Sequence, residues 1–120
     1  GVVLGKMEKH EEALNCFELV CKKNPRHLDA IFHKGIELAQ LDRHEKAINI
    51  FDDLLRQKKD NVNVIYAKAR SLAALNQDAQ SLEMLKKAIS KDPKTIRKWA
   101  KAEKIFERFH ENDQFNRIVR

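Results

Sequence analysis

Few residues in this sequence interrupt a regular helix. Among 120 residues there are only three glycines and two prolines. These residue types are the strongest local breakers of helices, and phosphate-binding loops need several glycines close together. Their scarcity favours long helices joined by short turns, and it excludes a glycine-rich nucleotide loop.

Cysteine and long apolar runs are equally scarce. Cys16 and Cys21 are the only cysteines, and a five-residue separation places them roughly 140° apart on a helix, which prevents local pairing. No apolar run approaches the roughly 18 residues of a membrane-spanning helix. The first residues also lack a signal-peptide pattern. We therefore expect no membrane span, a reduced cytoplasmic setting and a core position for Cys16.

The sequence also lacks patterns typical of catalytic or metal sites. Two of the five histidines, His10 and His44, lie 34 residues apart at the same place in the helical pattern, and a role at a turn or helix start explains both. Neither cysteine belongs to a paired zinc motif. No nucleophile stands beside an oriented base in any recognisable arrangement. We expect no enzyme, no metal and no cofactor.

Charge is abundant and unevenly distributed. Twenty-four Lys and Arg residues against 18 Asp and Glu give a net charge of +6. Residues 94–120 hold eight basic against four acidic residues, a net +4. The charged fraction of 35% exceeds the roughly 25% of an average domain, as expected for a thin fold with much surface. The basic character belongs mostly to the carboxy-terminal quarter.

A repeat of 34 residues organises the chain. Residues 28–41 and 45–57 each carry apolar side chains at three- and four-residue steps, which predicts two amphipathic helices. The link of three residues between them predicts an antiparallel hairpin. Shifting the pattern by 34 residues reproduces it in both directions, and Pro25 and Pro93 lie 68 residues apart, or two periods.

The repeat resembles the tetratricopeptide repeat family, whose unit is a helix-turn-helix of about 34 residues. Gly35 and Ala69 match the family's small residue in the first helix. A small residue followed four positions later by a large one recurs in the second helices: Ala13 with Phe17, Ala47 with Phe51, and Ser81 with Leu85. The resemblance implies an all-α fold, a right-handed superhelical stack of antiparallel helix pairs with about three repeats and partial units at both ends.

We divide this single domain, residues 1–120, into four units. Residues 1–27 form a partial repeat, 28–61 and 62–95 two full repeats, and 96–120 a partial repeat or capping helix. Residues 1–7 are predicted to end a first helix, with the second at 10–23. One long helix is expected at 94–110, and Asn112 is expected to cap a final short helix. The chain is expected to begin inside a repeat, as a piece of a longer array.

The resemblance implies a protein-interaction scaffold that binds a peptide or helix of a partner in a concave groove. In this family the first helices line that groove, at steps of four, three and four residues. These positions are Asp29, His33, Ile36 and Gln40, then Asn63, Ala67, Arg70 and Ala74, then Arg97, Lys101, Lys104 and Arg108.

The last four groove positions are all basic and fall within about 60° of arc on a continuous helix, which favours an acidic ligand segment. A solvated basic face is the plain alternative. Phe32 and Tyr66 either anchor a ligand or fill the seam between repeats. The candidate binding residues are Phe32, His33, Ile36, Tyr66, Arg70, Arg97, Lys101 and Lys104.

Two other functions remain open. A basic face suits RNA, although acidic residues throughout the chain argue against a nucleic-acid ligand. Exposed end helices would allow self-association into a homo-oligomer. Some relatives hold a carboxylate-ended peptide with lysines and asparagines. We do not predict that clamp, because Phe32, Ile36 and Ala67 occupy three of its positions.

Overall fold

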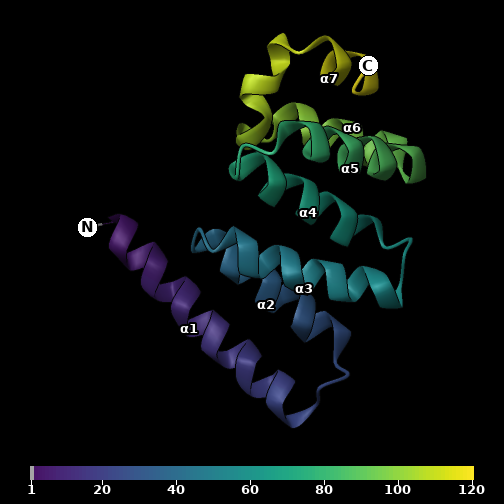
Figure 1. Cartoon of the computed structure of the whole chain (residues 1–120). Coiled ribbons are helices and arrows are strands. Elements are labelled where there is room, and N and C mark those ends of the chain that lie inside the picture. Colours follow the sequence, from purple (N-terminus) through teal and green to yellow (C-terminus); the bar gives the residue numbers. More distant parts are fainter. Residues whose placement is uncertain (1) are drawn as a thin grey trace.

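The described part of the chain folds into helices that follow one another in antiparallel pairs and are joined by short turns (Figure 1). The computed structural model describes residues 2–120, with side chains from residue 8 onward. Within that part of the chain the elements are α1 (Val2–Lys23), α2 (Leu28–Gln40), α3 (His44–Gln57), α4 (Val62–Ala74), α5 (Asp78–Lys91), α6 (Pro93–Ala102), the 3₁₀ helix η1 (Lys104–Glu111) and α7 (Asp113–Ile118). This confirms the all-α stack.

The period of 34 residues is also visible in the backbone. Asp42 and Asn76 turn the chain between the helices of each hairpin with φ angles of 63° and 61°. Aspartate and asparagine tolerate this left-handed conformation better than other residues with a side chain. His27 and Asn61, also one period apart, cap α2 and α4 by accepting hydrogen bonds from backbone N–H groups. Local signals therefore place both hairpins.

The interior consists of two apolar clusters that meet at α4. One joins α1 to α4 around Leu14, Leu38 and Phe51, and the other joins α4 to α7 around Leu85 and Phe106. Eight of the thirteen residues of α4 are buried, more than in any neighbouring helix. Because α4 is shared by both clusters, it connects the two halves of the stack.

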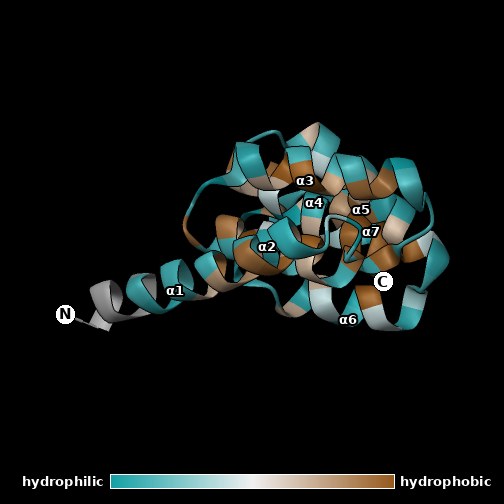
Figure 2. Cartoon of the chain, turned by 90° about the horizontal axis from the view of Figure 1, so that it is seen from below, coloured by the Kyte–Doolittle hydropathy of each residue, from teal (hydrophilic) through white to brown (hydrophobic). Residues whose placement is uncertain are grey.

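The predicted break near residues 8–10 is wrong, because α1 is one helix from Val2 to Lys23. Glu8 occupies the place that Asp42 and Asn76 hold one and two periods later. Glutamate favours a helix and disfavours the left-handed turn, so the helix continues. The core prediction for Cys16 is also wrong, since its side chain is exposed. In Figure 2, α1 projects from the body of the stack.

The predicted single helix at 94–110 is also wrong. α6 ends at Ala102, and Glu103 adopts an extended conformation with ψ 125° before η1 begins. The 3₁₀ form places residues three apart on one side, so Phe106 and Phe109 both reach the core, with 0% and 2% of their surfaces exposed. Their packing against Phe115 stabilises the bend.

The final short helix is as predicted. The Asn112 side chain accepts a hydrogen bond from the backbone N–H of Phe115 over 3.0 Å, which starts α7 at Asp113. Phe115 itself is buried. Among the described residues, no helix is long and apolar enough to span a bilayer.

Candidate functional site

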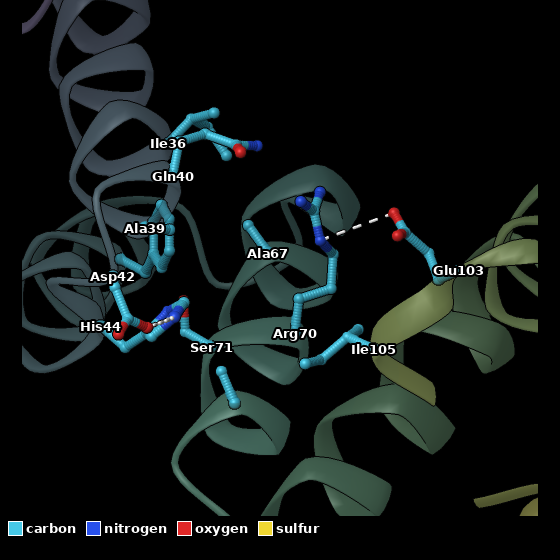
Figure 3. Close-up of a pocket in the computed structure, with 12 residues that line it drawn as sticks. Ile36, Ala39, Gln40, Asp42, His44, Ala67, Arg70, Ser71, Glu103 and Ile105 are labelled. Carbon is cyan, nitrogen blue, oxygen red and sulfur yellow. Dashed lines mark hydrogen bonds and ion pairs between the residues drawn. The ribbon is translucent and has the colours of Figure 1, made fainter. Parts of the chain in front are cut away.

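A pocket of about 330 Å³ lies between α2, α4 and the α6–η1 bend. Half of its lining residues are apolar and form one wall, with Ile36 and Ala39 from α2, Ala67 and Ala74 from α4, and Ile105 from η1. Figure 3 shows Ile36 and Gln40 facing Arg70 across the opening. A volume of this size with an apolar wall suits one large side chain of a ligand or a short turn of peptide.

Arg70 and Glu103 form a polar rim on one side of this pocket (Figure 3). Arg70 Nε lies 3.6 Å from Glu103 Oε1, and about a third of each side chain is exposed. This distance exceeds that of a good hydrogen bond, so the ion pair leaves the guanidinium able to bind another acceptor. The guanidinium also lies 6.0 Å from the centre of the Tyr66 ring, which limits where it can move.

Ser71, His44 and Asp42 form a chain of polar contacts in the pocket wall. His44 Nδ1 lies 3.2 Å from Ser71 Oγ, and His44 Nε2 lies 3.0 Å from Asp42 Oδ1. The residue types are those of a hydrolytic triad, but their exposure is inverted. Ser71 is 1% exposed, whereas the Asp42 side chain is 87% exposed. A nucleophile must reach substrate and its acid must be shielded, so this arrangement does not suit catalysis.

The same histidine position links neighbouring helices one period earlier. His10 Nδ1 lies 2.6 Å from Glu37 Oε2, and His44 reaches Ser71, which is Glu37 shifted by 34 residues. In each case the histidine joins a second helix of one unit to the first helix of the next. The turn or helix-start role predicted for both histidines is wrong for His10, which lies inside α1, whereas His44 begins α3 as predicted. Both histidines cross-link neighbouring units.

A sequence profile described as tetratricopeptide repeat matches residues 38–105, more than half of the chain. The chain belongs to the tetratricopeptide repeat family. This membership makes it a protein–protein interaction module, and the comparison finds no catalytic family. No curated protein and no solved structure matches the chain.

The tetratricopeptide spacing predicted much of the pocket lining. Ile36 and Arg70, both candidate binding residues, lie in the pocket together. So do Gln40, Ala67 and Ala74, the other groove positions on the facing parts of α2 and α4. These residues share one surface because the first helices of successive repeats stand side by side, with the same helical face toward the groove.

Phe32, His33 and Tyr66 lie elsewhere in this tetratricopeptide stack. Phe32 borders a smaller hollow of about 130 Å³ near the amino ends of α2 and α4. His33 is exposed and its ring stacks on Phe17, with the centroids 5.4 Å apart. Tyr66 is only 4% exposed and contacts Phe106. Tyr66 therefore fills the seam between units and does not offer a surface anchor.

Burial also governs the chemistry of the Tyr66 hydroxyl. Among the described residues it has no hydrogen-bond partner. Loss of solvent raises its pKa well above the ordinary value, the nearby Glu103 carboxylate raises it further, and Arg70 opposes both. The hydroxyl therefore stays protonated even at alkaline pH, and Tyr66 is not among the residues that line the pocket.

The cations predicted at the end of the groove do not line the pocket. Arg97 and Lys101 border a different hollow along α6, where Arg97 Nε donates to the Ile118 carbonyl oxygen over 3.1 Å. Lys104 is exposed at the start of η1. Arg108 pairs with Asp78 Oδ1 at 2.5 Å. The bend at Glu103 separates these residues, so the predicted single basic arc is wrong.

Sequence reasoning missed Glu103 and Ile105, which close the pocket. Both residues fell on other faces of the helix predicted for 94–110. No glycine or proline marks the bend, and its cause is the packing of aromatic residues that follow. No local signal could therefore have placed these two residues in the site.

Proposed function

We propose that the chain is a scaffold that binds a peptide or helical segment of a partner protein in the pocket between α2, α4 and the α6–η1 bend. The observation that carries this proposal is the pocket itself. It joins an apolar wall to a partly exposed arginine at the position where tetratricopeptide spacing predicts a groove. Interaction sites of this kind take an apolar anchor into a pocket and orient it with a few polar groups.

The anchor of the ligand is a large apolar side chain. Ile36 is only partly buried, because its neighbours in the pocket, Ala39 and Ala67, are small. Covering Ile36 and Ile105 with a ligand side chain removes apolar surface from water, which stabilises the complex. The two alanines leave room for that side chain.

The ligand segment also carries an acidic residue beside its anchor. Arg70 is the one lysine or arginine among the residues that line the pocket, and its long contact with Glu103 leaves it open to a second carboxylate. Arginine binds carboxylates through two parallel hydrogen bonds. The support for an acidic ligand thus comes from Arg70 alone, and no longer from the predicted arc of four basic residues.

Selection of random peptides displayed on phage, followed by calorimetry with the best peptide, tests this proposal. We expect Ile36→Glu to weaken binding at least about tenfold, equivalent to about 1.4 kcal/mol, because it places a charge on the apolar wall. We expect Arg70→Gln to weaken an acidic peptide by about fivefold or more, because the guanidinium contact is lost.

Two matched variants control for general effects on helix surfaces and charge. Leu19→Glu makes the same type of change on an exposed face of α1, where Leu19 is 60% exposed. Arg43→Gln removes an arginine from the Arg43–Glu11 ion pair, outside the pocket. We expect both to bind like the wild type. Equal losses in Ile36→Glu and Leu19→Glu would place the peptide outside the pocket.

A reducing cytoplasmic location is part of this proposal. Cys16 and Cys21 are both free thiols, and Cys16 is exposed. An exposed thiol is compatible with a compartment in which thiols stay reduced. Localisation of a tagged chain in cells tests this point, and entry into the secretory pathway would contradict it.

A further inference from the structure

The exposed side of α6 carries a basic surface that the pocket does not use. Lys94, Arg97, Lys98 and Lys101 fall within about 100° of arc, opposite the buried Ile96 and Ala100. We call these four cations the α6 basic face. They border a hollow of about 530 Å³ that shares no residue with the pocket.

None of these four cations forms an ion pair within the described part of the chain. In the rest of that part six lysine or arginine side chains do, namely Arg43, Arg56, Lys68, Arg70, Lys91 and Arg108. α6 itself contains no acidic residue, and the acid beside it, Asp92, accepts a hydrogen bond from the backbone N–H of Thr95 as the helix cap. The α6 basic face is therefore not neutralised by the fold.

This arrangement of charge is unfavourable for an isolated helix. Lys94 with Lys98, and Arg97 with Lys101, are like charges four residues apart, which destabilises a helix. Lys94 also lies in the first turn, where the helix dipole favours acidic residues over basic ones, and only Lys101, in the last turn, is favoured by the dipole. The core needs only Ile96 and Ala100 from this helix, so a mixed or neutral outer face would stabilise α6 more.

The basic surface continues beyond α6 to Arg120, which follows α7. Arg97 is tied to α7 by its hydrogen bond to the Ile118 carbonyl oxygen. Lys101 borders both the hollow along α6 and a second hollow with Val119 and Arg120. The four cations of the α6 basic face are thus held on a helix instead of a loose tail, which limits the conformational entropy lost when a ligand binds.

We propose that the α6 basic face is a second interaction surface, which binds a run of acidic residues in a partner protein. Lys94 to Lys101 spans roughly 10 Å along the helix, about the length of three or four extended residues. A nucleic acid is the less fitting occupant, because single strands also need aromatic rings for base stacking. The aromatic residue of α6, Trp99, is 41% exposed, but it lies outside this arc and packs on Tyr66 with ring centroids 5.5 Å apart.

Fluorescence anisotropy with labelled octaglutamate, at about 50 mM salt to limit screening, tests the proposal. The test variant is K94Q/K98Q/K101Q. Its control, K22Q/K23Q/K58Q, removes the same charge from exposed lysines of α1 and the end of α3. We expect the test variant to weaken octaglutamate binding about tenfold or more and the control to change it less than about twofold.

Three results would overturn the proposal. The first is no measurable binding of octaglutamate by the wild type. The second is an equal loss in the two triple variants, which would make the effect one of net charge. The third is tighter binding of dodecauridylate than of octaglutamate, lost in the test variant, which would make the surface a nucleic-acid site.

Two further measurements separate this surface from the pocket and from a folding defect. An excess of the peptide selected for the pocket should not displace octaglutamate, and displacement would place the acidic ligand in the pocket instead. Because the like charges destabilise α6, the test variant should melt about 2–4 °C above the wild type. A lower melting temperature would contradict the electrostatic argument.

Discussion

At the scale of single residues, the two full repeats pack their first helix against their second with different pairs of side chains. Gly35 in α2 faces Phe51 in α3, and a Cβ atom at Gly35 would lie only 2.7 Å from Cε1 of that ring. One period later the equivalent residues are Ala69 and Leu85, both fully buried. The larger side chain on the second helix is matched by the smaller residue on the first.

We expect Gly35→Ala to lower the free energy of unfolding by about 1 kcal/mol. The clash with Phe51, typically 1–3 kcal/mol for overpacking, exceeds the roughly 1 kcal/mol that alanine gains over glycine in a helix. Urea denaturation measures the change. In the double variant with Phe51→Leu, which copies the Ala69–Leu85 pair, the two losses should not add and a coupling of about 1 kcal/mol should appear. A more stable Gly35→Ala protein would contradict this prediction.

The surroundings of Tyr66 predict how its hydroxyl affects the free energy of unfolding. Because its hydroxyl is buried without a partner in the described residues, we expect Tyr66→Phe to leave stability unchanged or raise it by about 1 kcal/mol at pH 7. Urea denaturation again measures the change. A loss above about 1 kcal/mol would show that the hydroxyl has a partner.

Tyr66 should also make the protein sensitive to alkaline pH. Burial raises the pKa of Tyr66 in the folded protein, so above the unfolded value near 10 only the unfolded chain releases the proton. The free energy of unfolding should therefore fall as pH rises past about 10, by roughly 1 kcal/mol at about pH 10.5. The same titration on Tyr66→Phe isolates this contribution, and equal pH dependence of both proteins would contradict it.

At the scale of helices and turns, Asp42 and Asn76, which have left-handed backbone conformations, determine where each hairpin folds back. We expect Asn76→Ala to cost about 1 kcal/mol or more, because alanine at φ 61° lacks asparagine's tolerance of that conformation. Asn76→Gly should be close to neutral. Thermal denaturation compares both with Gln80→Ala, a substitution on the exposed face of α5. If Asn76→Ala and Gln80→Ala melt alike, backbone strain does not limit this turn.

At the scale of the whole molecule, stability should decline from the middle of the stack toward α1. Helix α4 lies between both apolar clusters, whereas Leu14 is the one buried residue among residues 8–23 of α1. Repeat proteins gain stability from each interface with a neighbour. We expect hydrogen exchange measured by mass spectrometry to be slowest in α4 and fastest in α1. Uniform exchange along the chain would show that the stack unfolds as one cooperative unit.

Self-association remains an alternative at this scale. Leu19 and Val20 of α1 are 60% and 39% exposed, although the matching residue of Val20 in each later unit, Leu54 or Ala88, is buried. Sedimentation equilibrium over a range of concentrations measures whether this surface pairs between copies. A monomer throughout would leave the pocket and the α6 basic face as the surfaces to study with partners.

The sequence by itself determined the helices and turns of the two full repeats. Gly35 and Ala69 predicted the close helix pairs, and Asn112 predicted the start of α7, because small residues and caps act through neighbours within a few positions. The same periodicity placed Ile36 and Arg70 on one surface, since successive units stack with equivalent faces together.

Only the tertiary structure decided where this periodicity stops. α6 bends at Glu103 because burying Phe106 and Phe109 against Phe115 is worth more than continuing a helix that local propensity allows. That bend closes the pocket with Glu103 and Ile105 and separates Lys104 from the basic face that Arg97 and Lys101 form on α6. The sequence therefore determined the repeating stack and half of its pocket. Long-range aromatic packing, which no local pattern encodes, determined the rest.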